Sequence, residues 1–185
     1  MCVLYAVSVL SLLSVAAAIP VPCDDVTKSL DSMDFQDKIM GKWIVIAATA
    51  NDIHSQNPLK DFDSFWLKFS QLSQNDSFLY TFAMKLKGDC IYFSYNATLE
   101  NSTITLHNSF NTTGVFLPAS DGYLALSIKN NIGYHIFYLL GKEAKLSDSE
   151  QDMFEKQEEC LCLKTPVFMD LKKELCPEKE TTPRF

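Results

Sequence analysis

The sequence predicts an all-β protein, a sandwich or barrel of eight antiparallel strands, followed by one α-helix. From residue 42 to residue 140, short apolar runs alternate with turn residues, a spacing typical of all-β sandwiches and barrels. Strands joined by such short turns favour antiparallel neighbours and therefore an up-and-down order. After residue 146 the apolar runs give way to a stretch rich in Glu, Gln and Lys, which favours a helix.

Residues that tolerate positive φ separate the predicted strands, for example at Lys87-Gly88-Asp89 and Asp121-Gly122. Only Asn51–Asp63 is long enough to be a substantial loop. The predicted strands are Lys42–Ala50, Ser64–Leu72, Phe78–Lys87, Cys90–Leu99, Ser102–Asn108, Thr113–Leu117, Tyr123–Lys129 and Gly133–Leu140.

The predicted C-terminal helix begins at a capping box, Ser147-Asp148-Ser149-Glu150, and extends to Cys160. Met153 and Phe154 give this helix an apolar side that can pack against the outside of a barrel. A shorter helical turn is expected around Asp24–Asp34, and residues 177–185 are expected to form a disordered tail.

The first predicted strand is apolar on both faces. Val45 and Ala47 have one parity, and Ile44, Ile46 and Ala48 have the other. Such a strand has to be covered on both sides. Gly41 then lets the entering chain approach closely, and Trp43 is expected to plug the closed end of a barrel.

The N-terminus reads as a signal peptide of residues 1–18. Val3–Val15 is apolar, and Ala16 and Ala18 occupy the positions that signal peptidase prefers, so cleavage is expected after Ala18. The segment before the apolar stretch has no Lys or Arg, which keeps a retained N-terminal anchor as the alternative. No second apolar stretch is long enough to span a bilayer, so stable membrane insertion is not expected.

Charge and sequons indicate a secreted glycoprotein. The formal net charge of −7 lies wholly beyond residue 20 and argues against binding to nucleic acid. Four Asn-x-Ser/Thr sequons can accept glycans if the chain enters the secretory pathway. These sequons begin at Asn75, Asn96, Asn101 and Asn111.

Five cysteines remain after removal of the leader, and in an oxidising compartment they predict two disulfides and one free thiol. Spacing alone leaves all the possible pairings open. A zinc site is not expected, because Cys160 and Cys162 have no second close pair and the three His are scattered. The five cysteines are Cys23, Cys90, Cys160, Cys162 and Cys176.

The motifs together resemble those of a lipocalin, and most closely the orosomucoid (α1-acid glycoprotein) branch, which includes tributyltin-binding and saxitoxin- or tetrodotoxin-binding proteins. The resemblance rests on Met40–Asn51, Cys90-Ile91-Tyr92, Glu159-Cys160-Leu161 and Asp170–Cys176, together with the order of eight strands and a helix. Apolipoprotein M is the nearest competing relative. The resemblance implies an eight-stranded antiparallel up-and-down barrel, formed by residues 19–176, with one C-terminal α-helix packed outside.

The resemblance also implies disulfides Cys23–Cys160 and Cys90–Cys176, although Cys162 could pair in place of Cys160. Gly41 and Trp43 would form the barrel floor. The Arg that commonly covers this Trp is absent, which leaves Lys142 as a substitute.

An eight-stranded barrel is either filled by its own side chains or able to hold one small ligand. With strand parity taken from the resemblance, the inward set is apolar and aromatic, with a few polar tips from Tyr and His, as expected of a pocket for a hydrophobic molecule. If His135 faces the cavity, binding would depend on pH. The predicted ligand-binding residues are Val45, Ala47, Phe65, Leu67, Phe69, Tyr80, Phe82, Met84, Tyr92, His135 and Phe137, and Thr49 and Leu86 share their parity.

The function expected from these features is a secreted, extracellular carrier of a small hydrophobic ligand such as a steroid, lipid, drug, organotin or toxin-like xenobiotic. The alternatives are an apolipoprotein M-like lysolipid carrier and a partner-binding acute-phase or immunomodulatory glycoprotein with a filled barrel. An enzyme is not expected, because the first strand carries no Cys and Cys162 follows the outer helix. No cofactor is expected, and the chain should be a monomer, with a disulfide dimer through Cys162 as the alternative.

Overall fold

The structure is a computed structural model that describes residues 22–30, 35–72, 77–100 and 102–179, without the side chains of residues 35 and 36. The expected signal peptide of residues 1–18, the sequon asparagines Asn75 and Asn101, and residues 180–185 of the expected tail lie outside the described residues. The elements in chain order are α1 (Cys23–Thr27), α2 (Phe35–Ile39), β1 (Gly41–Ala50), α3 (Ile53–Leu59), β2 (Phe62–Gln71), β3 (Ser77–Leu86), β4 (Asp89–Glu100), β5 (Thr103–Leu106), β6 (Thr112–Leu117), β7 (Tyr123–Lys129), β8 (His135–Gly141), α4 (Asp148–Cys160) and β9 (Val167–Phe168).

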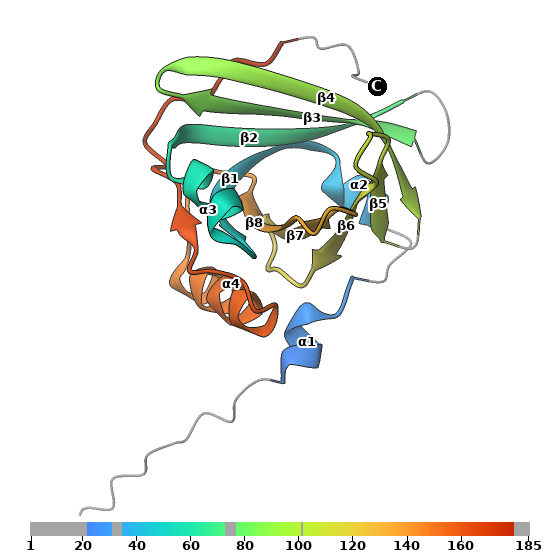
Figure 1. The fold of residues 1–185 in the computed structure, drawn as a ribbon, viewed down its shortest axis with the longest axis vertical. Helices are drawn as coiled ribbons and strands as arrows, with labels where there is room; N and C mark the ends of the chain where they lie inside the picture. The colour runs from blue at the N-terminus through green and yellow to red at the C-terminus, as the bar shows by residue number, and fades with distance from the viewer. Residues whose placement is uncertain (1–21, 31–34, 73–76, 101, 180–185) are drawn as a thin grey trace, which may run out of the picture.

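Strands β1 to β8 form a closed antiparallel barrel (Figure 1). From β2 to β8 each strand pairs with the next one in the chain, and β1 pairs with both β8 and β2, which closes the sheet. This arrangement confirms the predicted up-and-down barrel. A short ninth strand, β9, was not predicted, and it pairs with β1 through Ala47 and Ala48.

The turn between β3 and β4 shows why the strands end where they do. Lys87 and Gly88 have φ values of 51° and 91°. Two consecutive positive φ values define a tight hairpin turn whose twist matches that of the flanking strands. The sequence Lys87-Gly88-Asp89 therefore ends one strand and begins the next, as predicted.

Residues 51–63 were predicted to form a loop, but they contain helix α3. The Asp52 side chain caps this helix by accepting hydrogen bonds from the backbone N–H groups of His54 and Ser55. Buried Gln56 accepts from Ala50 N and donates to Thr165 O, each at 2.7 Å. These bonds fix α3 beside the end of β1, at the mouth of the barrel.

Helix α4 packs on the outside of the barrel, as predicted. Its N-cap is Ser147, whose hydroxyl accepts from Glu150 N, the first half of the expected capping box. The Phe154 ring stacks on Phe137 of β8 with 4.6 Å between ring centroids. The apolar layer between α4 and the barrel consists of Ile46, Ala47, Leu117, Ala125, Phe137, Leu139 and Phe154.

Strand β1 is covered on both faces, and a β-bulge changes its parity. The pairing with β8 shifts register between Val45 and Ala47, so Ile46 is an extra residue. Val45 and Ala48 consequently belong to the interior cluster, whereas Ile46 and Ala47 face α4. The two-sided covering that the sequence predicted is therefore provided by the barrel interior and by α4.

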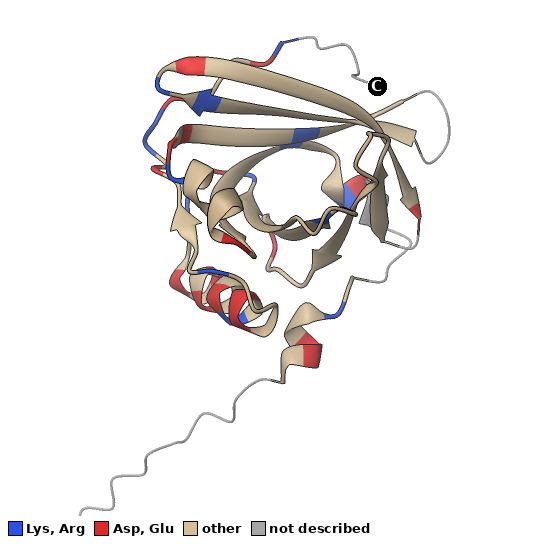
Figure 2. Cartoon of the chain, viewed as in Figure 1, with Lys and Arg blue, Asp and Glu red and all other residues tan. Residues whose placement is uncertain are grey.

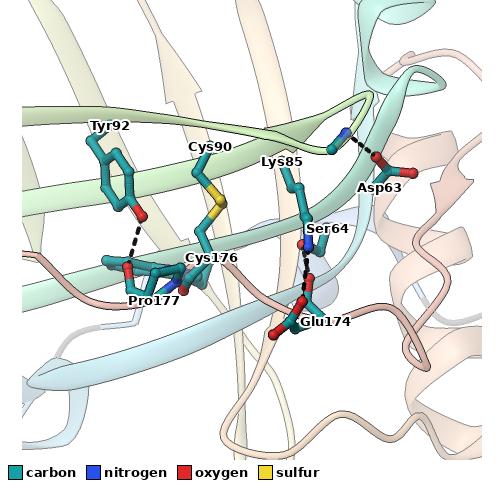
Figure 3. Close-up of a disulfide and its surroundings, with 10 residues drawn as sticks. Asp63, Ser64, Lys85, Cys90, Tyr92, Glu174, Cys176 and Pro177 are labelled. Atoms are coloured by element: carbon teal, nitrogen blue, oxygen red, sulfur yellow. Dashed lines mark hydrogen bonds and ion pairs between the residues drawn. A yellow bond between two sulfur atoms is a disulfide. The ribbon is translucent and has the colours of Figure 1, made fainter.

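Two disulfides fasten the ends of the chain to the outside of the barrel. Cys23 in α1 pairs with Cys160 in α4, and Cys90 in β4 pairs with Cys176, the second of which is drawn in Figure 3. These are the pairings implied by the resemblance. Cys162 is the free cysteine among the described residues, and it is exposed.

The segment beyond Cys176 lies against the outer face of the sheet for three residues. Tyr92 donates a hydrogen bond to Pro177 O at 2.9 Å (Figure 3), and Lys68 contacts Glu178 at 2.6 Å. Residues 177–179, which were expected to begin the disordered tail, thus have defined contacts.

Charged residues concentrate away from the barrel wall. Figure 2 shows acidic residues gathered on α4 and α1, while the strands are largely uncharged. None of the helices in the described part of the chain is long and apolar enough to cross a membrane.

Candidate functional site: the barrel interior

The barrel is closed at the end where β1 begins. Trp43 is 3% exposed, and its indole N–H donates to Ile39 O at 2.7 Å. Lys142 covers the ring with its ammonium 3.7 Å from the centroid and donates to Met40 O. Burial lowers the pKa of Lys142. Trp43 thus covers this end of the barrel, and Lys142 lies over its ring.

The inner face of the barrel is apolar. Between the strand ends, none of the inward-facing positions of β1 to β8 carries Asp, Glu, Lys, Arg or His. A charged ligand group would find no side chain of opposite charge on this wall. Inward-facing residues include Val45, Ala48, Ala50, Phe65, Leu67, Phe69, Phe78, Tyr80, Phe82, Met84, Tyr95, Ala97, Leu99, Ile104, Leu106, Phe116, Leu124, Leu126, Ile128, Ile136, Tyr138 and Leu140.

Aromatic rings run along this wall from the floor to the mouth. Phe69 lies 5.3 Å from Tyr80 between centroids, and Tyr80 lies 5.5 Å from Phe82. Phe82 stacks on Phe93 at 4.9 Å. The wall therefore offers aromatic surface to an apolar molecule.

Burial of the inner wall is uneven, and the less buried side chains lie on β3 and β4. Near the floor, Phe69 and Phe116 are 1% and 0% exposed. Toward the mouth, Phe82, Met84 and Tyr95 face inward but are only half-buried. An inward-facing side chain can remain partly solvent-accessible only if the space in front of it is not completely filled, so the wall around Phe82, Met84 and Tyr95 is incompletely covered.

Three inner-face tyrosines remain protonated phenols at neutral pH. Burial raises the pKa of Tyr80 and of Tyr138 well above the ordinary value for tyrosine. Burial also raises the pKa of Tyr134, which lies at the mouth just before β8, to about 12. These hydroxyls, together with that of Tyr95, are polar groups in a largely apolar interior.

Seven of the eleven predicted ligand-binding residues lie on the inner face, and four do not. The seven are Val45, Phe65, Leu67, Phe69, Tyr80, Phe82 and Met84.

Ala47 is one of the four exceptions. Strict alternation from Val45 would place Ala47 and Thr49 inside, but the bulge at Ile46 turns both outward. Ala47 packs under α4, and the Thr49 hydroxyl donates to Lys164 O. Ala48 and Ala50 take the inner positions instead.

Tyr92 is outside because it has the same parity as Cys90, whose disulfide leads to the tail on the outer face (Figure 3). The residues of β4 that face inward have the opposite parity and include Tyr95. The outward direction of Tyr92 was predictable from the sequence. A Cys that pairs with a C-terminal tail beyond an outer helix cannot face the barrel interior, and Tyr92 has the parity of Cys90.

Phe137 and His135 also lie on the outer face. Phe137 packs against α4, and the imidazole of His135 hydrogen bonds the Ser127 hydroxyl at 2.8 Å. Burial, and then the charge of Lys129, lower the pKa of His135 to about 4. His135 therefore does not face the cavity. The pH-dependent binding that would follow from an inward-facing His135 is not expected.

The inner-face residues missed from the sequence are chiefly Tyr95, Tyr134 and Tyr138. β8 is apolar on both faces because both are covered, so its composition did not reveal its parity. Tyr134 lies within the predicted strand Gly133–Leu140 and directly before β8 in the structure, but its inward parity was not assigned from the sequence.

In the part of the chain that the structure describes, hollows of different size lie beside this site. A cavity of about 10 Å³, the size of one water molecule, borders Tyr80, Leu126 and Ile128 inside the wall. A cleft of about 480 Å³ lies outside the floor, bordered by Trp43, Lys142 and the turn before β7.

The groups expected on the exterior are partly described. Asn96 lies on β4 and is half-buried, and Asn111 is exposed with φ 46°. Among the described residues, no three His, Cys, Asp or Glu side chains come together as a metal site.

Comparisons with known proteins show the fold. No protein-family model matches the chain, and no curated protein matches it significantly. Among solved structures, the siderocalin Ex-FABP, reported to function through dual ligand specificities, matches with a TM-score of 0.64 at 13% identity over 80% of this chain and 99% of that one. The chain therefore has the lipocalin fold, a closed eight-stranded antiparallel barrel with a C-terminal helix outside.

Proposed function

We propose that the protein is a secreted carrier that binds a small hydrophobic ligand inside the barrel and performs no chemistry on it. The observation that carries this proposal is the open, aromatic, uncharged inner wall above a sealed floor. Burial of ligand surface against such a wall contributes about 25 cal/mol per Å². A micromolar affinity, about −8 kcal/mol, requires a few hundred Å² of well-covered surface, because part of the gain offsets the freedom lost on binding.

The contents of the wall favour a lipophile over the other functions considered. A lysolipid carrier would have to accommodate a phosphate, and the inner face presents no cation to it. The position of Cys162 supports binding without catalysis, because its thiol is exposed on the outside, beyond the end of α4. We also propose that the protein belongs to the orosomucoid-like branch of the lipocalins, because its sequence motifs resemble those of that branch.

Titration with N-phenyl-1-naphthylamine, whose fluorescence rises in apolar surroundings, tests the proposal. We expect a saturable increase with a micromolar Kd. Phe82→Ala should weaken binding at least several-fold, because it removes a half-buried ring from the mouth. Phe168→Ala, which removes an exposed ring from β9 outside the barrel, is the matched control. Absence of saturable binding to this probe, and also to steroids, fatty acids and organotins, would refute the carrier function.

Secretion and glycosylation are separate parts of the proposal. Expression of the whole chain in mammalian cells should release a protein whose N-terminal residue is Ile19, as Edman sequencing can show. Endoglycosidase treatment should lower its mass. Retention in the membrane fraction with an intact leader would instead support an anchor. Non-reducing electrophoresis will show whether the exposed thiol of Cys162 leaves the chain a monomer or links two copies.

A further inference from the structure

Four tyrosine side chains belong to the interior cluster or pack against it, and their hydroxyls indicate the chemical class of the ligand. We propose that the ligand is a neutral lipophile carrying a hydrogen-bond acceptor oxygen, such as a ketone, and that one or two hydroxyls of the set Tyr80, Tyr95, Tyr134 and Tyr138 donate to this oxygen. The inference rests on the carrier function proposed above and narrows it.

The four residues come from two sides of the barrel. Tyr80 on β3 and Tyr95 on β4 are direct cross-strand partners. Tyr138 comes from β8, which β1 and β2 separate from β3 in the closed sheet. Its ring lies 5.6 Å from that of Phe65. Tyr134 stands at the mouth just before β8 and packs against the same interior cluster.

The hydroxyls lie close enough to influence one another. After burial, Tyr134 and Tyr95 are the groups that raise the pKa of Tyr80, and Tyr134 and Tyr80 are those that raise the pKa of Tyr138. Electrostatic effects of this kind fall off with distance. Tyr80, which is also the cross-strand partner of Tyr95, therefore lies within electrostatic range of the other three tyrosines.

None of these four hydroxyls hydrogen bonds a protein atom in the part of the chain that the structure describes. The buried side-chain oxygen or nitrogen without a partner there is Oε2 of Glu158 on α4. The tyrosine oxygens are therefore not fully enclosed by protein atoms, although Tyr80 and Tyr138 are only 3% and 8% exposed. Buried polar groups are normally hydrogen-bonded. Open, unpaired hydroxyls on buried rings thus point to a polar group that arrives with a ligand, or to water in its absence.

The surroundings favour a neutral acceptor. A carboxylate or an ammonium would enter without an opposite charge on the inner face, and desolvation of an unpaired charge is strongly unfavourable. A phenol that stays protonated donates its O–H to a carbonyl oxygen, while the adjacent rings contact the apolar body of the ligand. An organic cation held against ring faces is the competing class, and the experiment includes it.

Calorimetric titration with four probes of one ring system tests the inference. The probes are 1-acetylnaphthalene, 1-ethylnaphthalene, 1-naphthoate and (1-naphthylmethyl)trimethylammonium. They present a ketone, a hydrocarbon of similar size, an anion and a cation. We expect the ketone to bind about tenfold more tightly than the hydrocarbon, the advantage of roughly one added hydrogen bond. Both charged probes should bind more weakly than the ketone.

Variants that lack these hydroxyls test whether the preference for the ketone depends on them. Y80F/Y138F should reduce ketone affinity to that of the hydrocarbon and leave hydrocarbon affinity unchanged. Tyr95→Phe, at a half-buried position, gives a second and milder variant if the double variant unfolds. Tyr92→Phe removes a hydroxyl from the outer face and is the matched control, with no expected effect on any probe.

The outcomes separate the two proposals. Equal affinity for ketone and hydrocarbon, tightest binding of a charged probe, or a ketone preference that survives both Tyr variants would overturn this inference and leave the carrier function standing. Failure of all four probes, while N-phenyl-1-naphthylamine binds, would also overturn it. If that probe fails as well, the carrier function is lost.

Discussion

The inner and outer faces of the barrel differ in whether their polar side chains are hydrogen-bonded to the protein. On the outer face, Trp66 donates to Cys176 O, Ser64 donates to Glu174 O, and the imidazole of His135 bonds Ser127. On the inner face, the hydroxyls of Tyr80 and Tyr138 bond no atom of the described chain.

The bonds of Ser64 and Trp66 hold the tail against the sheet, that of His135 joins β8 to β7, and the Gln157 amide of α4 bonds the N-terminal segment at Val26 O. Polar groups on the outer face therefore stabilise the fold, whereas those on the inner face are free to meet a ligand. Changes on the outer face should lower stability and spare binding, and changes on the inner face should do the reverse.

Removal of the tail disulfide should have the largest effect. Cys90→Ser with Cys176→Ser opens a link across a sequence separation of 86 residues, and the loop-closure model gives a loss of about 4–5 kcal/mol. Urea denaturation measures this loss, with Cys162→Ser as the control that removes an exposed free thiol. Binding of N-phenyl-1-naphthylamine to the folded fraction should not change. A loss under about 1 kcal/mol would mean that the tail does not stabilise the outer face.

Gln157 should show the next largest effect. Its buried amide donates to Val26 O and Pro118 O, each at 2.8 Å, and so fastens the N-terminal segment and the turn before β7 to α4. Gln157→Leu leaves two carbonyls without this partner and should cost about 1–3 kcal/mol by chemical denaturation. Gln151→Leu, at a half-buried position on the same helix, is the control and should change stability far less. Equal effects of the two variants would contradict the role given to Gln157.

Stability should fall in acid partly because of His135, while binding stays constant. The pKa of this side chain is about 4 in the folded protein and about 6.5 in an unfolded chain. Below pH 6.5 the unfolded chain therefore takes up a proton that the folded protein does not. The folded state accordingly loses stability as the pH drops toward 4, and the contribution is fully retained above 6.5.

Because His135 is only half-buried, its slope should stay below about 1.4 kcal/mol per pH unit. His135→Gln should show a shallower decline between pH 6.5 and 4 than the wild type, and His107→Gln, at an exposed position, should follow the wild type. Probe affinity should be flat from pH 5 to pH 8, because the inner-face phenols do not titrate there. A probe affinity that changed with pH in the wild type, but not in His135→Gln, would show that this side chain does act on the lumen.

The smallest effects on stability are expected from two Tyr→Phe variants, one on each face of the barrel. Tyr92→Phe loses an outer hydrogen bond to Pro177 O and should cost about 0.5–1.5 kcal/mol. Tyr138→Phe loses a hydroxyl that bonds no described atom and should alter stability by less than about 0.5 kcal/mol. A larger loss from Tyr138→Phe than from Tyr92→Phe, measured by thermal denaturation, would erase the distinction between the faces.

Local chemistry made much of the fold predictable from the sequence. Turns such as Lys87-Gly88-Asp89 and the cap at Ser147 are decided by neighbouring residues, and the structure places them as expected. Helix α3 was missed because its seven residues include Pro58, and its stability comes from the Asp52 cap and from the distant contact of Gln56 with Thr165.

The inner face was harder to predict, because parity depends on pairing between strands. One extra residue at Ile46 reversed the faces of Ala47 and Ala48. In β8, where Phe137 and Tyr138 are both buried, alternation carries no information about direction. Only β4 held a usable signal, since the bonded Cys90 fixes which of its residues face outward.

A crystal structure of the protein with N-phenyl-1-naphthylamine tests the central claim most directly. The account predicts the probe inside the barrel, above Trp43, with its rings against Phe82 and its amine near the hydroxyl of Tyr80 or Tyr138. A probe bound only in the cleft outside the floor, or a lumen occupied by the protein's own side chains, would contradict it.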